Sequence, residues 1–441
     1  LNAGALLTGA GAVTISAGTV NVNAGDIYRL TGTTSVTGGT LAASGDLIGL
    51  SSSSLSPSGT MLNVSGTGNL SVAGNLVSTT AGGALDVGGT LLTKSGSGTL
   101  TIGGNLANIS GGSSVSHHGV LDLTDTSLSL SAPLVQLEGG STITALSGPV
   151  FKITGGSLTL SGANGVLISA DNSANNINRT GGFVEMTNTN VTFATNIGQF
   201  GATDVLTVSM GAADANFRLT DSNLTVNGTF GGLGNAYGTT ASPTIAGVHV
   251  IATDTAGLPS TISLGGPLLR ASTGATLTNT NAQIQLTNMN VTQSVGATVP
   301  LINLSLGLYT MSGPLLSMTG GTILLQNGVG GAVVNASTRI ASSTTSPFIS
   351  LTNATVTTPL GVVTPLFNLV PTGISTMSGP LVVSSGSTLA FGAAPLRVIG
   401  SGTLNGSGTG AFLDLTGGSL TLGLRAVFLN PGIVSVAGPL L

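Results

Sequence analysis

The sequence contains no cysteine and no tryptophan, and only 5% of its 441 residues are charged. Without cysteine, the chain forms neither disulfides nor thiolate metal sites. Nine basic and thirteen acidic side chains give a net charge of −4, which argues against nucleic acid as a partner. No run of about 18 apolar residues occurs, so we expect no membrane-spanning segment.

Strong helix formers are also scarce, whereas glycine alone accounts for 70 residues and hydrophobic residues for 41%. An average soluble domain is about 25% charged, so serine, threonine and asparagine must cover much of this surface. Apolar residues in such number and in regular alternation give a burial capacity that disordered segments lack. The composition therefore predicts an all-β protein.

One short motif recurs from end to end and is clearest at 412–423, FLDLTGGSLTLG, where leucines alternate with polar residues on both sides of Gly417-Gly418. Alternation at period 2 predicts strands with one buried face, and the glycine pair predicts a corner between them. The same frame returns at 120–130, 150–160 and 315–325. One unit is too small to bury a core by itself, so we expect the units to stack.

The period of the motif follows from the polar residue at the centre of each apolar–polar–apolar triplet. In the more regular part of the chain these residues are Arg270, Gln285, Asn303, Ser317, Asn335, Ser350 and Asn368. Their spacing alternates between about 15 and about 18 residues. We predict a β-solenoid, a parallel β-helix with about 16 residues per coil. A coil of about 33 residues with two similar halves is the alternative.

We expect residues 1–441 to form a single continuous β-solenoid, with looser Gly/Ser-rich coils over 1–119 and more regular coils over 120–441. A tandem duplication lies around 286–382, where 286–304 resembles 351–369 and 311–316 resembles 377–382. Both ends follow the pattern of the repeat, so we expect the chain to be either a mature piece or a segment of a longer one. An antiparallel sandwich is the competing architecture, but it needs Asn-Gly or Asp-Gly hairpin turns, which are few.

Several charged residues occupy the polar position of an alternating run: Arg29, Asp86, Asp122, Lys152, Glu185, Arg218, Arg270 and Asp414. They would form either a binding stripe on one face or a solvated column in which mixed signs limit repulsion and discourage lateral aggregation. We favour the solvated column.

The residues best suited to catalysis or metal binding each lack a group that this chemistry requires. Asp122 and Asp125 are the nearest carboxylate pair, but their unit has none of the aromatic platforms on which sugar rings stack during glycoside cleavage. The pair His117-His118 cannot supply two ligands to one metal, because adjacent side chains of an extended segment point in opposite directions. We expect these histidines to lie in an exposed loop.

His249 lies between two valines, and we expect it to face solvent. We therefore assign no catalytic, cofactor-binding or metal-binding residue, expect no cofactor, and predict that the protein is not an enzyme.

The Gly-Gly-Ser-Leu-Thr-Leu, Gly-Asn-Leu-Ser-Val and Leu-Asp-Leu-Thr units resemble the passenger repeats of bacterial autotransporters and filamentous-haemagglutinin-like exoproteins. The resemblance extends diffusely over nearly the whole chain. It implies export, a right-handed β-helix and an adhesive or matrix role. No recognisable secretion domain or membrane barrel accompanies these repeats, and no functional residue carries over from the resemblance.

We therefore expect an extracellular structural rod: a surface fibre, a filament subunit or an adhesin stalk. Self-association end to end is the expected partnership, and surface glycans or matrix are further candidate partners. The alternative is a carbohydrate-active β-helix enzyme, such as a polysaccharide lyase or hydrolase.

Overall fold

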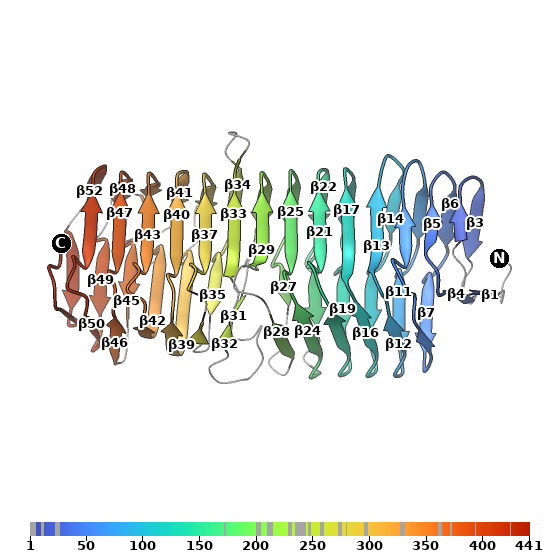
Figure 1. Ribbon diagram of the computed structural model, residues 1–441, viewed down its shortest axis with the longest axis horizontal. Coiled ribbons are helices and arrows are strands. Elements are labelled where there is room, and N and C mark those ends of the chain that lie inside the picture. The colour runs from blue at the N-terminus through green and yellow to red at the C-terminus, as the bar shows by residue number, and fades with distance from the viewer. Residues whose placement is uncertain are drawn as a thin grey trace. The chain divides into compact units, whose positions relative to one another are not determined.

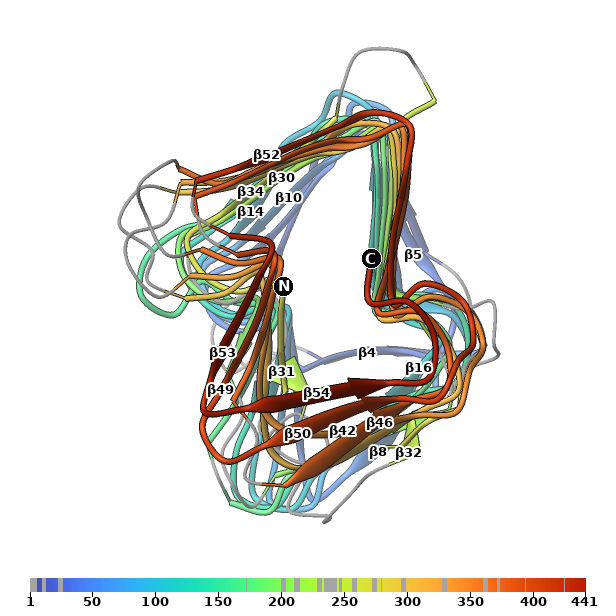
Figure 2. The same cartoon turned by 90° about the vertical axis from the view of Figure 1, so that its left-hand side faces the viewer.

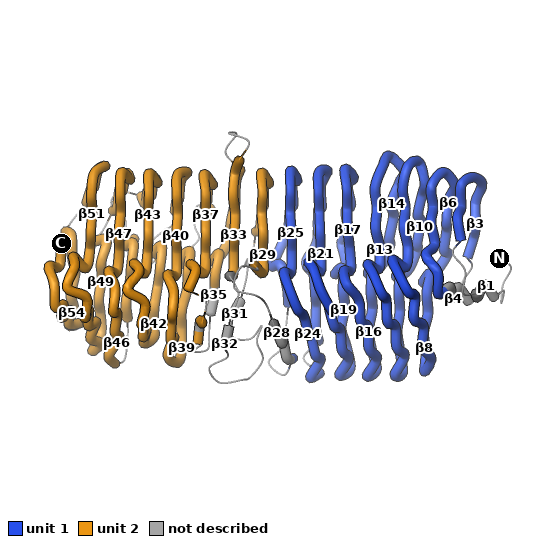
Figure 3. Tube along the Cα trace, viewed as in Figure 1, with its two compact units in different colours: residues 1–209 blue, residues 210–441 orange. Residues whose placement is uncertain are grey.

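The structure is a computed structural model in which the chain forms two compact units, residues 1–209 and residues 210–441 (Figure 3). It describes residues 6–9, 13–22, 27–171, 173–199, 204–209, 215–227, 232–233, 244–245, 248–255, 260–271, 276–278, 280–294, 299–326, 331–359, 364–370, 373–392, 394–423 and 425–441. Every regular element in these ranges is a β-strand. Within the same ranges there is no helix long and apolar enough to cross a membrane.

Unit 1 is a stack of coils in which the chain passes along four sides (Figures 1 and 2). Its first side contains β2 (Val13–Ile15), β5 (Thr34–Val36), β9 (Leu62–Val64), β13 (Thr90–Ser95), β17 (Gly119–Thr124), β21 (Phe151–Thr154) and β25 (Val184–Thr187). Its second side contains β3 (Thr19–Val22), β6 (Thr40–Ala43), β10 (Asn69–Val72) and β14 (Leu100–Ile102), followed by β18 (Ser127–Leu130), β22 (Ser157–Leu160) and β26 (Asn190–Phe193).

The third side of unit 1 contains β7 (Ile48–Ser51), β11 (Val77–Thr80), β15 (Ala107–Ile109), β19 (Val135–Leu137), β23 (Ile168–Ala170) and β27 (Gly198–Gln199). The fourth contains β8 (Ser54–Leu55), β12 (Ala84–Asp86), β16 (Ser114–His117), β20 (Thr142–Ala145), β24 (Asn176–Thr180) and β28 (Val205–Ser209). Near the N-terminus, β1 (Leu6–Gly9) pairs separately with β4 (Ile27–Leu30).

Unit 2 repeats this plan. Its first side contains β29 (Ala215–Thr220), β33 (Val248–Thr253), β37 (Ile284–Thr287), β40 (Leu316–Thr319), β43 (Ile349–Thr352), β47 (Val382–Ser385) and β51 (Leu413–Thr416). Its second side contains β30 (Asn223–Val226), β34 (Thr261–Leu264), β38 (Asn290–Gln293), β41 (Thr322–Leu325), β44 (Thr355–Thr357), β48 (Thr388–Phe391) and β52 (Ser419–Leu422).

The third side of unit 2 contains β31 (Gly232–Leu233), β35 (Leu269–Ala271), β45 (Phe367–Leu369), β49 (Leu396–Ile399) and β53 (Val427–Asn430). The fourth contains β32 (Thr244–Ile245), β36 (Thr276–Leu277), β46 (Ile374–Met377), β50 (Thr403–Gly406) and β54 (Ile433–Val436). Two longer strands, β39 (Ile302–Met311) and β42 (Val334–Ser342), run along both of these sides.

Within the described residues, the strands of neighbouring coils pair in parallel, as the pairing of β40 with β43 illustrates. The predicted parallel β-solenoid is therefore confirmed, and the antiparallel sandwich is excluded. Seen from the C-terminal end, the chain runs anticlockwise from β52 through β53 to β54 while the coils approach the viewer, which makes the solenoid of unit 2 right-handed (Figure 2). The same sense of turn holds within unit 1 (Figure 1).

The predicted coil length of about 16 residues is wrong. Hydrogen bonds between neighbouring coils join Thr93 to Asn63, 30 residues away, and Asn368 to Asn335, 33 residues away. A full coil therefore consists of two half-coils that share the same sequence pattern. This is the alternative prediction of a coil of about 33 residues. Consecutive polar positions fall on different sides: Asn303 and Asn335 pair on the third side, whereas Ser317 and Ser350 pair on the first.

The core consists of inward columns in which equivalent residues of successive coils lie directly above one another. On the first side of unit 2, Leu286, Met318 and Leu351 form such a column, and each is 1% exposed. Burying a side chain of this size contributes about 1.5–3 kcal/mol, so the stack supplies the core that a single coil lacks.

Corners between the first and second sides use residues with positive φ. Asp125, Gly155 and Asn188 occupy this corner in successive coils of unit 1, with φ of 50°, 66° and 50°. Glycine adopts this region freely, and asparagine and aspartate adopt it more readily than other residues. The predicted glycine corner is confirmed at Gly417 and Gly418, whose φ values are 64° and 79°.

Candidate functional site

The charged residues of the alternating runs do not form one column. Asp122, Lys152 and Glu185 are register neighbours on the first side of unit 1, where their signs alternate from coil to coil. Asp86 lies on the fourth side of that unit, where it accepts a hydrogen bond from Ser116 Oγ.

In unit 2, Arg218 and Asp414 lie on the first side, separated by uncharged residues of the same column. The side chains of Arg29 and Arg270 lie outside the described residues. Among the charged residues that the structure describes on the first side, the signs alternate in unit 1, as expected of a column with mixed signs, and uncharged residues intervene in unit 2.

The nearest carboxylate pair has separate structural positions. Asp122 lies on the outer face of β17 and is half-buried, with its Oδ1 lacking a hydrogen-bond partner. Asp125 forms the positive-φ corner, where its carboxylate packs so closely on Gly155 of the next coil that a Cβ at Gly155 would collide with it. The role of Asp125 is thus conformational.

His117 and His118 point in opposite directions, as predicted, but the expectation that both are exposed is wrong. His118 is exposed, and its Nδ1 lies 2.6 Å from Ser147 Oγ. His117 is fully buried at the end of β16, and neither ring nitrogen has a hydrogen-bond partner. Burial and the neighbouring His118 lower the pKa of His117 to about 4.

His249 is also buried, at 3% exposure, which contradicts the prediction that it faces solvent. It is the second residue of β33, at a corner where both His249 and the next residue, Val250, are buried. Its ring meets that of Phe217 edge to face, with centroids 5.8 Å apart. Gln283, whose carbonyl accepts from His249 N in the next coil, is 1% exposed and its side-chain amide has no partner.

Two cations are enclosed in unit 1. Lys94 is 1% exposed, and its Nζ donates to the carbonyl oxygens of Ser95 (2.8 Å) and Gly96 (3.0 Å) at the adjacent corner. Burial lowers the pKa of Lys94. Arg179 is 6% exposed, and its Nη1 donates to Gly181 O at 3.1 Å. Corner carbonyls thus hold both cations, which explains how a largely apolar interior accommodates them.

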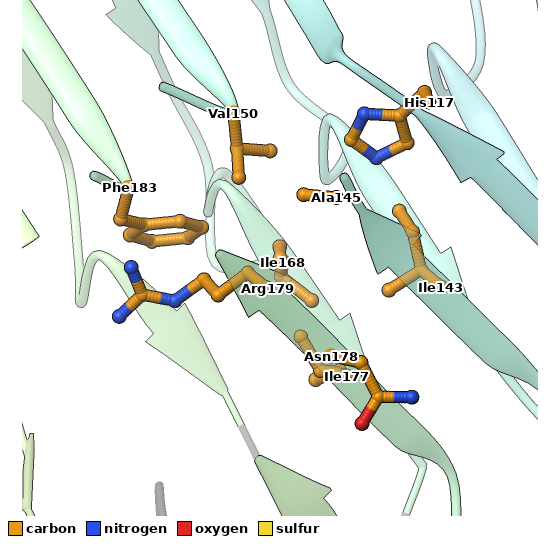
Figure 4. Close-up of a pocket in the computed structure, with 9 residues that line it drawn as sticks. All are labelled: His117, Ile143, Ala145, Val150, Ile168, Ile177, Asn178, Arg179 and Phe183. Atoms are coloured by element: carbon orange, nitrogen blue, oxygen red, sulfur yellow. The ribbon is translucent and has the colours of Figure 1, made fainter. Parts of the chain in front are cut away.

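A small cavity of about 10 Å³ lies beside His117 in unit 1 (Figure 4). Apolar side chains such as Ile143, Ile177 and Phe183 form most of its lining, and Asn178 also belongs to it. The guanidinium of Arg179 lies at its opposite end, 5.2 Å from the Phe183 ring centroid. The space is about that of one water molecule, so it is too small for an organic substrate.

An amide ladder on the third side of unit 2 is a feature that sequence reasoning missed. Asn335 Nδ2 donates to Asn303 Oδ1 at 3.0 Å, and Asn368 Nδ2 donates to Asn335 Oδ1 at 2.7 Å. The signal was present, because asparagine recurs at every second polar position of the repeat. Only the longer coil places these residues in register, and the resulting bonds tie coil to coil.

Within the residues that the structure describes, no group of three or more His, Asp or Glu side chains is placed to hold a metal ion. No family model, curated protein or solved structure matches this chain. The features that recur from coil to coil are parallel pairing, apolar columns, the amide ladder and positive-φ corners.

Proposed function

We propose that this chain is a non-catalytic structural β-solenoid of the extracellular space, serving as a surface fibre, filament subunit or adhesin stalk. The proposed role depends on the regular stacking of the coils, in which each coil pairs with the next through main-chain hydrogen bonds and a continuous apolar column. The resemblance of its repeats to exported passenger regions supports the location and an adhesive role toward surface glycans or matrix. Its low charge is compatible with close packing against a further copy.

The observation that carries the proposal is the regularity of the stack. Within the described residues, strands of successive coils pair in parallel on the first and second sides of both units, and equivalent inward residues lie above one another. Coils of one construction can therefore be added along the axis without a new kind of contact.

In the coil that contains β51 and β52, the inward residues Leu415 and Leu420 are half-exposed, whereas their counterparts Leu351 and Leu389 in inner coils are 1% and 3% exposed. We propose that one copy stacks on another through such inward residues, in a head-to-tail contact that propagates as a filament unless rotation closes a ring.

Sedimentation velocity and negative-stain imaging of the 441-residue chain test this proposal. We expect concentration-dependent association into linear particles. Leu420→Lys should abolish it, because the lysine can extend to solvent from a free edge but would be buried without a partner under a second coil. Thr421→Lys, on the outer face of the same strand, is the matched control and should leave association intact.

A concentration-independent monomer would refute the filament proposal. Equal association in the Leu420→Lys and Thr421→Lys variants would show that any self-association uses another surface. The non-catalytic part has a separate test, in which purified protein is incubated with acidic and neutral polysaccharides. We expect no cleavage, and cleavage that disappears in an Asp122→Asn variant would favour a carbohydrate-active enzyme.

A further inference from the structure

His117 is a titratable side chain enclosed in unit 1 without a partner. It is 0% exposed, and both of its ring nitrogens lack hydrogen bonds. A neutral imidazole has one donor and one acceptor nitrogen, and buried polar atoms are nearly always paired. The neutral ring is therefore already unsatisfied where it lies, and an added proton would create a second unpaired donor together with a charge.

The surroundings of the ring offer nothing to compensate that charge. Arg179 lines the same cavity and is already cationic, with its guanidinium committed to Gly181 O and the face of Phe183 (Figure 4). Asn178 is the other polar residue of the lining, but its amide points away from His117 (Figure 4), and the lining contains no carboxylate. The adjacent His118 points outward to Ser147, and its charge would add to the repulsion.

Main-chain pairing connects this ring to the whole fourth side. His117 pairs in register with Ala145 of β20, and Ala145 pairs with Arg179 of β24. A displacement of His117 toward water would therefore separate β16 from β20 and bring solvent to Arg179 as well. The three strands share one column, so they would respond together.

We propose that protonation of His117 opens the fourth side of unit 1 at β16, β20 and β24. We call this pH-dependent contact the His117 latch. The charged ring requires acceptors that the apolar cavity lacks, and opening of the strands supplies them as water. This inference is independent of the proposed filament function.

The direction of the response follows from linkage. Because the pKa of His117 in the closed form is lowered to about 4, the closed form binds fewer protons than the open form, in which the ring titrates near its ordinary value of about 6.5. The closed form is thus fully stable above about pH 6.5 and loses stability as the pH falls toward 4.

Hydrogen exchange of the full chain, read by mass spectrometry between pH 7 and pH 4 and corrected for intrinsic exchange rates, tests the latch. We expect the opening equilibrium of residues 114–117 and 142–145 to rise roughly 100-fold over this range. Residues 349–352 of unit 2 should show no comparable change, because neither β43 nor its pairing partners β40 and β47 contain a histidine.

His117→Leu removes the titrating group and should make exchange of these peptides independent of pH, whereas the exposed control His118→Gln should keep the acid response. An equal acid response in His117→Leu and the unmodified chain would overturn the proposal. Should His117→Leu fail to fold, an NMR titration of the histidine rings in the unmodified chain decides the question. A buried ring that stays neutral down to about pH 4 supports the latch, and one that titrates near 6.5 refutes it.

Discussion

The same inward position of the first side carries a lysine in unit 1 and a leucine in unit 2. Lys94 and Leu351 are each 1% exposed, and both point into an apolar column. Lys94 is accommodated because its Nζ reaches two corner carbonyls, at 2.8 and 3.0 Å. The comparison teaches that the repeat frame fixes which way a side chain points, whereas the nearest unpaired main-chain groups decide whether a charge is tolerated there.

A charge without such partners should have the largest effect. We expect Leu351→Asp to lower the free energy of unfolding of unit 2 by about 3–5 kcal/mol, because it buries an uncompensated carboxylate. Leu415→Asp should cost clearly less, since the equivalent residue of the last coil is half-exposed. Denaturant titration measures both, and Asp414→Ser on the outer face should change little. Equal losses at Leu351 and Asp414 would mean that the inner and outer faces are misassigned.

Replacing Lys94 tests the other half of the comparison. Lys94→Ala should destabilise unit 1 by about 2–4 kcal/mol, because it leaves a cavity and two unpaired corner carbonyls. Lys94→Met keeps the packing of the stem and removes the buried charge, so its loss should stay near 1 kcal/mol. Thermal unfolding of the two variants distinguishes packing from charge. A larger loss in Lys94→Met than in Lys94→Ala would contradict this account.

The outward-facing side chains of the two units also differ, and we expect their replacement to change stability by a smaller amount. Asn335→Ala removes both hydrogen bonds of the amide ladder in unit 2 and should cost about 1–2 kcal/mol. Asn108 occupies the matching position on the third side of unit 1, but its register neighbour is Gln136 and its Oδ1 has no partner. Asn108→Ala should therefore be close to neutral. Similar losses at the two sites in denaturant titrations would show that the ladder adds nothing to coil stacking.

Sequence alternation was sufficient to predict the burial of one buried histidine but not of the other. His117 lies two residues after the inward Val115 on the same strand, so strict alternation already places it inside. His249 lies at a corner where two consecutive residues are buried, as Val120 and Leu121 are at the same corner in unit 1. Alternation breaks at such corners, and only the path of the chain shows which residues turn inward.

The sequence by itself determined the strands, the inward and outward faces and the glycine corners, because these depend on period-2 alternation and on the local φ preferences of single residues. It also determined that the short repeats stack, since no single repeat has enough apolar surface for a core. Only the tertiary structure decided the length of the coil, because two half-coils share one sequence frame and nothing local distinguishes a half turn from a full one. That choice alone brings Asn303 beneath Asn335, alternates the signs of Asp122, Lys152 and Glu185, and encloses His117 beside Arg179: such neighbours lie about 30 residues apart or more, and main-chain pairing between coils places them together.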